Sequence, residues 1–332
     1  MSVHWAGRQD AWITSLANAI FSIALMSPEW AQAQAWPTRA TTAIVPFAAG
    51  SASDVISRVV LDQVSKQIAK PIVIENRPGA GGILGANMVA KAAPDGYTML
   101  ASGALATTHA LYPKLPYDTL HAFVPVMPLG QQPLVLVAAP SKGFRTVNDL
   151  VAAAKARPGK LNFASAGVGS GSHLAAERLR ISAQFEAQHI PFRGATEGVT
   201  EVLAGRVDFF FGPLAPVLAL INEGKLVALA VSASTRSPAL SQVPTITEAG
   251  LPDATYVYWA GLFLPAKTPR DIVVRIHRES IDAVQVSTVR DRLAAIGVEP
   301  MMMGLEQFDR YFRDDVETTV RLVKAANIIA QP

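Results

Sequence analysis

The stretch VPFAAGSASDVISRVV, residues 45–60, places a loop of small residues between a strand and a helix. An apolar run at residues 43–45 stops at Pro46, and a helical pattern opens at Asp54. From there the apolar positions 56, 59, 60, 64 and 68 recur at the spacing of one helix face. The stretch therefore predicts a strand–turn–helix unit whose turn carries almost no chemically distinctive side chain.

The same alternation of short strands and helices continues along the chain. Further β-rich runs are PIVIE (71–75), YTMLA (97–101), LNFAS (161–165), HIPF (189–192), VDFFF (207–211) and LVALAVS (226–232). Strands separated by helical patterns predict an α/β fold with a mostly parallel sheet. Three more helices are predicted in the tail, near residues 270–284, 288–296 and 305–326.

Two stretches predict crossings between domains. A proline-punctuated segment (112–133) is followed by an apolar strand (134–140), and YVYWAGLFLPA (256–266) marks a second crossing. Two α/β lobes with two connections between them indicate a hinged architecture. Its natural ligand site is the crevice outside the carboxyl ends of the strands.

Composition limits the class of protein. Half of the 332 residues are hydrophobic, 17% are charged, and the 29 basic residues barely exceed the 26 acidic ones. This balance predicts a compact globular protein, and without a basic run we expect no nucleic-acid partner. The chain has no cysteine, which excludes disulfides, thiolate metal sites and a cysteine nucleophile.

Residues 1–35 have the features of a cleavable signal peptide. Arg8 precedes the apolar segment ITSLANAIFSIALM (13–26), and Ala33-Gln34-Ala35 fits the small-x-small rule for cleavage before Trp36. The apolar segment is too short to predict a membrane span. Acidic residues in this region are unusual for a signal peptide, and a frayed N-terminal helix is the alternative.

Three loops of small residues occupy the same place, after a strand and before a helix. They are PFAAGSAS (46–53), NRPGAGG (76–82) and SAGVGSGS (165–172). At a helix start several backbone N–H groups lack partners, and small residues let an anion approach them closely. The loops therefore predict a shared site for a carboxylate or another anion. The alternative is that their glycines and serines are ordinary turn and capping residues.

Enzymatic motifs are weak. The chain has no G-x-S-x-G nucleophile motif and no G-x-G-x-x-G dinucleotide motif, and its histidines are not at metal-ligand spacing. His173 follows the serines of the third loop and could act as a base, but no acid obviously orients it. Asp54 fits a helix cap better than a catalytic role. We predict no catalytic residue, no metal and no cofactor.

Two arginines and two aromatic residues lie beside the loops. Arg77 and Arg193 each follow a strand, where a guanidinium could bind a carboxylate bidentately, but a solvated surface arginine is the alternative for both. Phe47 and Trp259 could pack on a ligand's carbon skeleton, although aromatic residues next to strands are usually core.

The chain resembles a known family, the periplasmic solute receptors of tripartite tricarboxylate transporters, also called Bug or TctC receptors. The similar stretches run through essentially the whole chain after residue 40. They are VPFAAGSASDVISR (45–58), VIENRPGAGGILGANMVAKAAPDGYTML (73–100), LNFASAGVGSGSHLAAE (161–177), HIPFRGATEGVTEVLAGRVDFFF (189–211), GKLVALAVSASTRSPALSQVPTITEAGLP (224–252), YWAGLFLPAKTP (258–269) and VKAANI (323–328).

The resemblance implies a type II periplasmic-binding-protein fold, in which two α/β lobes joined by a two-strand hinge close on a ligand. It implies that residues 36–138 and 258–332 form lobe 1 and residues 139–257 form lobe 2. The implied ligand is a small carboxylate, either a dicarboxylate, a tricarboxylate or an aromatic acid, delivered by a monomeric periplasmic receptor to membrane permease subunits. The implied ligand-binding residues are Phe47, Ala49, Ser51, Ser53, Ala80, Gly81 and Ser102 in one lobe and Ser165, Gly169, Ser170, Arg193 and Gly194 in the other.

Two positions depart from the family pattern. The first loop usually has Gly-Gly-x-x-Asp, whereas this chain has Ser51 after Gly50, which narrows the approach and adds a donor. Many members carry an acidic residue where this chain has Phe211-Gly212-Pro213, which favours an acid without an amino group. Two other functions stay open. One is a sensor that docks on a histidine kinase, and the other is a periplasmic enzyme with His173 as base and Ser170 as nucleophile.

Overall fold

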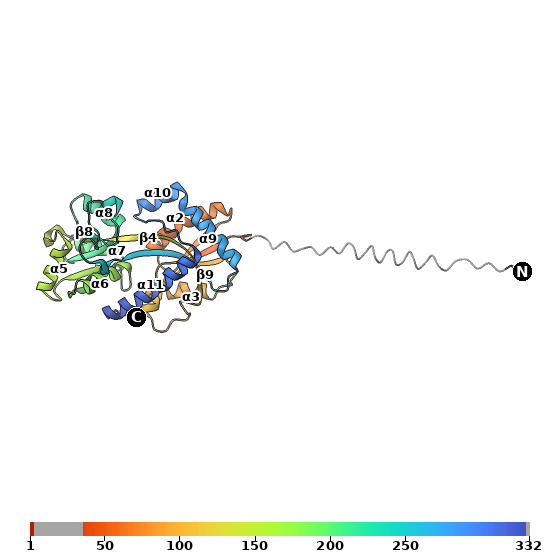
Figure 1. Ribbon diagram of the computed structural model, residues 1–332, viewed down its shortest axis with the longest axis horizontal. Helices are drawn as coiled ribbons and strands as arrows, with labels where there is room; N and C mark the ends of the chain where they lie inside the picture. The colour runs from red at the N-terminus through yellow and green to blue at the C-terminus, as the bar shows by residue number, and fades with distance from the viewer. Residues whose placement is uncertain (3–35, 330–332) are drawn as a thin grey trace. The chain divides into compact units, whose positions relative to one another are not determined.

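The computed structural model describes residues 1–2 and 36–329, and Figure 1 draws its helices and strands. Contacts divide the chain into two compact units, Met1–Thr38 and Arg39–Pro332, and the fold described below is that of the second unit. The predicted signal peptide at residues 1–35 lies almost wholly outside the described residues. No helix of the described part is both long and apolar enough to cross a membrane.

Three parallel strands begin the first lobe. Strands β1 (Thr41–Val45), β2 (Ile72–Asn76) and β3 (Thr98–Ser102) pair in the order β2-β1-β3, as the strand–helix alternation predicts. They are followed by helices α2 (Ala52–Gln67), α3 (Ile83–Ala90) and α4 (Leu105–Leu111). The C-terminal helices α9 (Arg270–Gln285), α10 (Ser287–Ala295) and α11 (Leu305–Ala326) pack on the same lobe and confirm the three helices predicted for the tail.

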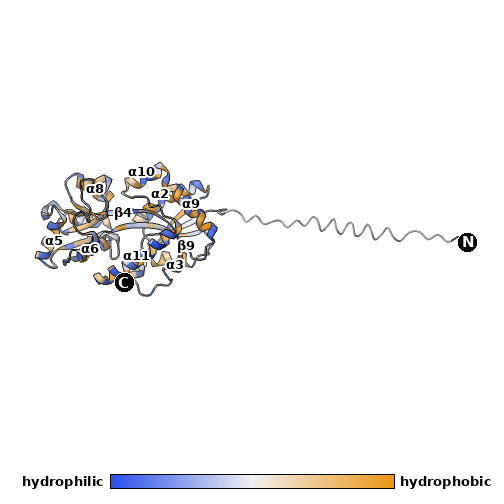
Figure 2. Ribbon diagram, in the orientation of Figure 1, coloured by the Kyte–Doolittle hydropathy of each residue, from blue (hydrophilic) through white to orange (hydrophobic). Residues whose placement is uncertain are grey.

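Helix α11 shows why the tail folds onto this lobe. Its buried apolar residues are spaced so that they lie on the same side of the helix, which gives the helix one apolar face. They are Phe308, Phe312, Val316, Leu322 and Val323. Figure 2 shows hydrophobic and hydrophilic residues mixed along α9 and α11. The apolar face of α11 closes the core of the first lobe, where the rings of Trp259 and Phe308 meet edge to face with centroids 5.6 Å apart.

The second lobe has its own strands and helices. Strand β5 (Asn162–Ser165) lies parallel to β6 (Gln188–Pro191) and β7 (Phe209–Pro213), with β8 (Val227–Val231) nearby. Its helices are α5 (Val147–Ala156), α6 (Gly171–Ser182), α7 (Ala195–Leu203) and α8 (Leu214–Asn222). Phe209 and Phe211 enter one core and Phe210 enters another, because successive side chains of a strand face opposite sides. Helices therefore cover both faces of this sheet.

Strand β4 (Phe123–Ala138) corrects the sequence analysis, which placed a strand only at residues 134–140. The strand starts within the proline-punctuated segment and pairs antiparallel with β9 (Val257–Pro265). The register shifts between Pro125 and Met127 and again between Pro128 and Gly130. Such irregularities tolerate proline, which has no N–H to give to a regular ladder.

Strands β4 and β9 connect the two lobes. Strand β4 pairs with β9 up to Pro133 and with β7 and β8 from Leu134 to Ala138, so it passes from one lobe into the other. Figure 1 shows both strands running between the helices α5, α6 and α8 and the helices α2, α3, α9 and α10. The complete strand order is β2-β1-β3-β9-β4-β7-β5-β6, with β8 beside β4. The lobe boundaries at residues 138 and 258 stay a prediction.

Candidate functional site

A cavity of about 730 Å³ lies at the carboxyl ends of the parallel strands of both lobes. Many of its lining residues directly follow β1, β3, β5, β6 and β7, and others come from the connecting strands β4 and β9. This is the crevice that the sequence analysis predicts for a hinged α/β protein. The two lobes therefore contribute their loops to one space.

The loop between β1 and α2 is held by its own polar groups. Ser51 caps α2, its Oγ accepting a hydrogen bond from the Asp54 N–H at 3.4 Å, and Asp54 Oδ2 accepts one from the Gly50 N–H at 2.8 Å. Arg58 and Asn76 also donate to Asp54. Burial opposes the charge of Asp54, but these hydrogen bonds outweigh burial and lower its pKa. Asp54 is a structural carboxylate, as the sequence analysis expects.

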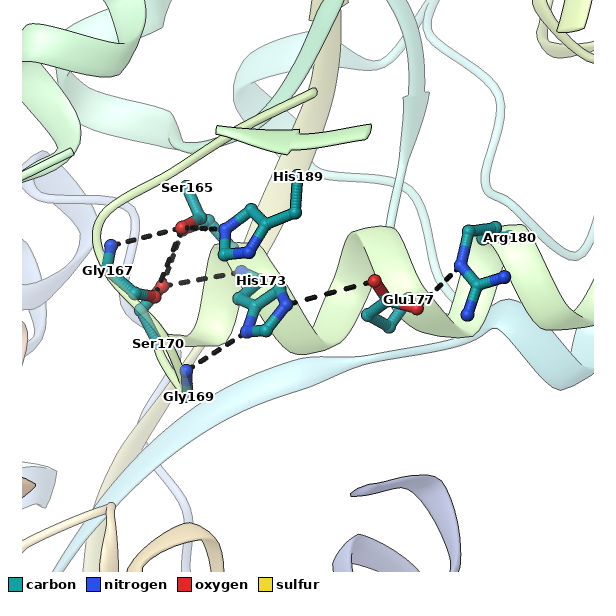
Figure 3. Close-up of polar contacts among 9 residues, drawn as sticks. Ser165, Gly167, Gly169, Ser170, His173, Glu177, Arg180 and His189 are labelled. Atoms are coloured by element: carbon teal, nitrogen blue, oxygen red, sulfur yellow. Dashed lines mark hydrogen bonds and ion pairs between the residues drawn. The ribbon is translucent and has the colours of Figure 1, made fainter. Parts of the chain in front are cut away.

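The loop between β5 and α6 is also held from within. Ser170 caps α6 by accepting a hydrogen bond from the His173 N–H at 3.4 Å, and Ser172 Oγ accepts one from the Ala166 N–H at 2.9 Å. The N–H of Gly169 donates to Nδ1 of His173 at 3.0 Å (Figure 3). Gly169 is therefore a cavity residue whose amide is already engaged inside the loop.

Three helices begin at the cavity. The first two residues of α2, α6 and α7 all line it; they are Ala52 and Ser53, Gly171 and Ser172, and Ala195 and Thr196. The first N–H groups of a helix have no acceptor within the helix, and the helix dipole adds partial positive charge at this end. The cavity thus receives hydrogen-bond donors and positive potential from both lobes.

Arg193 supplies the cavity with a full positive charge. It follows β6 at the start of α7, and no other charged side chain is found among the described residues that line the cavity. Arg77 lies elsewhere. Its guanidinium pairs with Glu75 at 2.7 Å, and neither residue lines the cavity. The structure thus separates two arginines that look equivalent in the sequence.

The connecting strands contribute residues that sequence reasoning missed. Tyr258 places its hydroxyl 2.6 Å from Ser53 Oγ, and Gln132 donates to the carbonyl of Ile296 at 2.8 Å. Burial raises the pKa of Tyr258 to about 12, against the opposing effect of the Ser53 hydrogen bond, so the phenol stays protonated. Tyr256 lies two positions before Tyr258 and also lines the cavity. Period-two alternation at the predicted crossing was the signal that could have found both tyrosines.

Most of the predicted ligand-binding residues come together in the structure. Among the described residues, the cavity lining includes Phe47, Ala49, Ser51, Ser53, Gly81, Gly169, Ser170, Arg193 and Gly194.

Three predicted residues lie outside this lining. Ala80 precedes Gly81 in the second loop. Of the residues in this loop (76–82), Gly81 lines the cavity and Ala80 does not. Ser102 is buried and accepts a hydrogen bond from the Ala104 N–H, and Ser165 is buried against His189. Trp259 is also core, and its indole N–H donates to Asp315.

The enzyme alternative needs one correction. The sequence analysis found no acid to orient His173, but Glu177 lies one helical turn further along α6, with Oε1 3.8 Å from Nε2 of His173. The Ser170 hydroxyl, however, contacts Ser172 Oγ at 3.0 Å and the backbone N–H of His173. In the described contacts the imidazole of His173 accepts a hydrogen bond from the N–H of Gly169 and makes none with the hydroxyl of Ser170. Ser170 and His173 are therefore not assembled as the nucleophile and base of the enzyme alternative.

Comparison with known proteins decides the family. A sequence model described as the tripartite tricarboxylate transporter family receptor, TctC, matches residues 56–328. The chain belongs to this family. Protein BugT of Bordetella pertussis, a relative of the receptor, is 34% identical over 295 residues, which cover 88% of this chain and 90% of BugT.

Solved structures agree with the fold of the receptor. Rpa4515 of R. palustris, solved with adipate, is 30% identical with a TM-score of 0.79, covering 89% of this chain and 99% of that one. MatC (Rpa3494) from Rhodopseudomonas palustris, with bound malate, is 32% identical with a TM-score of 0.76, covering 87% and 100%. The receptor therefore has the two-lobed α/β periplasmic-binding-protein fold that the resemblance implied. It is a periplasmic solute-binding receptor and not an enzyme.

Proposed function

We propose that the receptor captures a small carboxylate in the cavity between its lobes and delivers it to the membrane subunits of a tripartite transporter. The observation that carries the proposal is the meeting of three helix starts and Arg193 at a cavity with no acidic side chain among its described lining residues. This arrangement favours an anion. The adipate and malate in the structures of two similar proteins support a carboxylate as that anion.

The predicted residues that line the cavity are the proposed contacts. Ser51, Ser53 and Ser170 offer hydroxyls, and Arg193 offers a guanidinium. Apolar lining residues such as Ile56 would contact the carbon skeleton of the acid. Micromolar affinity corresponds to about 8 kcal/mol. Several charge-assisted hydrogen bonds, at about 1.5–3 kcal/mol each, together with buried carbon could supply that free energy after ordering costs.

We infer that the lobes close on the acid by bending at β4 and β9, with the lobe boundaries predicted from the sequence. Close approaches between the lobes support this motion. A Cβ built on Gly169 would lie 2.6 Å from Leu111 of α4, and one built on Gly297 would lie 2.8 Å from Leu214 of α8. Glycine at both positions leaves room for the lobes to meet beside the cavity, as a hinge closure requires.

Delivery and export complete the proposal. Removal of residues 1–35 as a signal peptide would release a monomeric receptor into the periplasm, where the family acts. The liganded receptor would then dock on the permease subunits of the membrane complex, which the family name implies.

A thermal-shift screen of the exported protein tests this function. Malate, adipate, citrate and benzoate are compared with adipamide, a neutral analogue of adipate. An acid at 100-fold above its dissociation constant stabilises the folded state by about 2.7 kcal/mol. For a protein of roughly 300 residues that is a rise in Tm of about 4–5 °C. Adipamide should leave Tm unchanged. If none of the acids raises Tm, or if adipamide matches adipate, the proposed function is overturned.

A further inference from the structure

Two histidines are stacked behind the loop between β5 and α6. The rings of His173 on α6 and His189 on β6 lie 3.8 Å apart between centroids, at 11° to each other. Phe163 of β5 stacks on His189 at 5.0 Å, which places the pair against the core of the second lobe. His173 is 3% exposed. Neither histidine lines the cavity, so the cavity description leaves the pair unexplained.

His173 contacts one glycine of the loop directly, and His189 is linked to another through Ser165 (Figure 3). His173 accepts a hydrogen bond at Nδ1 from the N–H of Gly169, at 3.0 Å. Nε2 of His189 lies 2.6 Å from Ser165 Oγ, and this oxygen accepts a hydrogen bond from the N–H of Gly167 at 3.1 Å. Gly167 and Gly169 have φ values of 116° and 77°, the left-handed region that glycine tolerates. The two contacts therefore hold the two residues at which the loop turns.

The surroundings keep both rings neutral. Burial, together with the neighbouring His189 and Arg180, lowers the pKa of His173 to about 3. Burial lowers the pKa of His189 to about 4. Glu177 is the acid that faces His173, but its carboxylate bonds Arg180 at 2.7 Å, and burial raises its own pKa. Because Nδ1 of a neutral His173 accepts a hydrogen bond from the N–H of Gly169, the ring carries its own proton on Nε2.

Some backbone N–H groups of the loop donate hydrogen bonds within the loop, and others have no such acceptor. Side chains accept hydrogen bonds from the N–H groups of Ala166, Gly167, Gly169 and His173, and Ser170 donates to the carbonyl of Gly167. The N–H groups of Gly171 and Ser172, the first two residues of α6, have no acceptor within the helix. Both residues line the cavity. The histidine side of the loop is thus held by hydrogen bonds, whereas the N–H groups of Gly171 and Ser172 stay available on the cavity side.

We propose that His173 and His189 are positioning residues, which hold the loop at residues 165–172 so that the N–H groups of Gly171 and Ser172 face the bound anion. The inference rests on the proposed function, since it assigns the anion to this cavity. A histidine is suited to the role because its Nδ1 accepts a hydrogen bond while its ring stacks in an apolar core. A neutral imidazole also makes the loop insensitive to pH near neutrality.

Amide hydrogen exchange without added acid provides the first test. His173→Leu removes the acceptor, whereas His173→Asn keeps an oxygen near the position of Nδ1. The amide of Gly169 should exchange at least about tenfold faster in His173→Leu than in the wild type, because it has lost its acceptor. His173→Asn should restore most of the protection, and the amide of Leu179 in the same helix should report an intact fold in all three proteins. Equal exchange of Gly169 in the wild type and His173→Leu overturns the proposal.

Affinity and pH dependence provide the second test, with adipate as the probe. His173→Leu should bind adipate roughly 10- to 100-fold more weakly and His173→Asn within a few-fold of the wild type, because one loop hydrogen bond is lost or kept. Wild-type affinity should stay constant between about pH 6 and 8, where an ordinary histidine titrates. Equal affinity of all three proteins overturns the positioning role. If the wild type binds none of the acids, the proposed function fails, and the exchange of Gly169 still decides whether His173 holds the loop.

Discussion

The hydroxyl oxygens of Ser53 and Tyr258 lie 2.6 Å apart and join the first turn of α2 to strand β9. Ser53 is fully buried, and both residues line the cavity. The raised pKa of Tyr258, about 12, keeps its proton on the phenol. If Tyr258 donates to Ser53, the serine proton is free to point at an anion. One hydrogen bond would then couple the first turn of α2, where the anion is proposed to bind, to strand β9, which connects the lobes.

Tyr258→Phe should weaken both stability and binding. The loss of the Ser53–Tyr258 hydrogen bond should lower the free energy of unfolding by about 0.5–1.5 kcal/mol, and affinity for adipate should fall several-fold. Thermal unfolding and calorimetric titration measure the two effects. Tyr112→Phe is the matched control, because Tyr112 also lines the cavity. Equal behaviour of the two variants would show that the Ser53–Tyr258 contact has no special role.

Ser51→Asp should abolish acid binding without unfolding the protein. Aspartate caps a helix as well as serine does, so α2 should remain intact. Two like charges about 4 Å apart repel by about 4 kcal/mol at a partly solvated site, which predicts an affinity loss on the order of 1,000-fold. Ser51→Asn, an equally good cap without charge, should stay within several-fold of the wild type. Similar affinities of the Asp and Asn variants would place the anion elsewhere.

Arg193→Gln should weaken binding, and Arg77→Gln should not. Arg193 lines the cavity, whereas Arg77 pairs with Glu75 outside it. The loss of one charge-assisted hydrogen bond predicts roughly tenfold weaker affinity for adipate. The difference between Arg193→Gln and the wild type should be smaller at high salt, where the exposed charge of Arg193 is screened. Titrations at low and high salt measure both effects. A wild-type salt dependence that persists unchanged in Arg193→Gln would exclude this guanidinium as the ligand's partner.

The three loops could be predicted from short stretches of sequence, but contacts between residues far apart in the chain could not. The strand–loop–helix units are visible because each lies within one segment, as at Pro46 and Asp54. The stack of His173 on His189 cannot be predicted from the sequence, because His173 lies on α6 and His189 on β6, and only the folded sheet brings these two elements together. Glu177 was overlooked as a neighbour of His173 although the i,i+4 spacing places them on one helix face.

The prolines of β4 misled the sequence analysis for a physical reason. Proline normally ends a regular ladder, so a strand was predicted only from residue 134, after the proline-punctuated segment 112–133, whereas β4 begins at Phe123. The register shifts beside Pro125 and Pro128 depend on pairing with β9, which lies over a hundred residues away in the chain. The alternation at residues 256–258 places Tyr256 and Tyr258 on one strand face, but which face borders the cavity is decided by how the lobes meet.

Asp315→Asn should change the pH dependence of stability. Asp315 on α11 accepts a hydrogen bond from the indole N–H of Trp259 at 3.1 Å. Burial raises the pKa of Asp315 to about 6, against the opposing effects of Trp259 and Arg178. The folded protein therefore keeps this proton to a higher pH than the unfolded chain, whose Asp pKa is about 3.9. Stability is lost as the pH rises through this window, because ionisation is easier after unfolding.

Asparagine can accept the same hydrogen bond from Trp259 without ionising. The difference in Tm between Asp315→Asn and the wild type should therefore be near zero at about pH 4, grow between about pH 4 and 6, and stay constant above that. Because Asp315 is only partly buried, the gain at neutral pH should be about 1–2 kcal/mol, less than the full shift would give. Asp314→Asn, at the exposed neighbouring position, is the control and should show no such step. A variant that is less stable than the wild type at neutral pH would mean that the Asp315 carboxylate stabilises the contact between α11 and β9 through its charge.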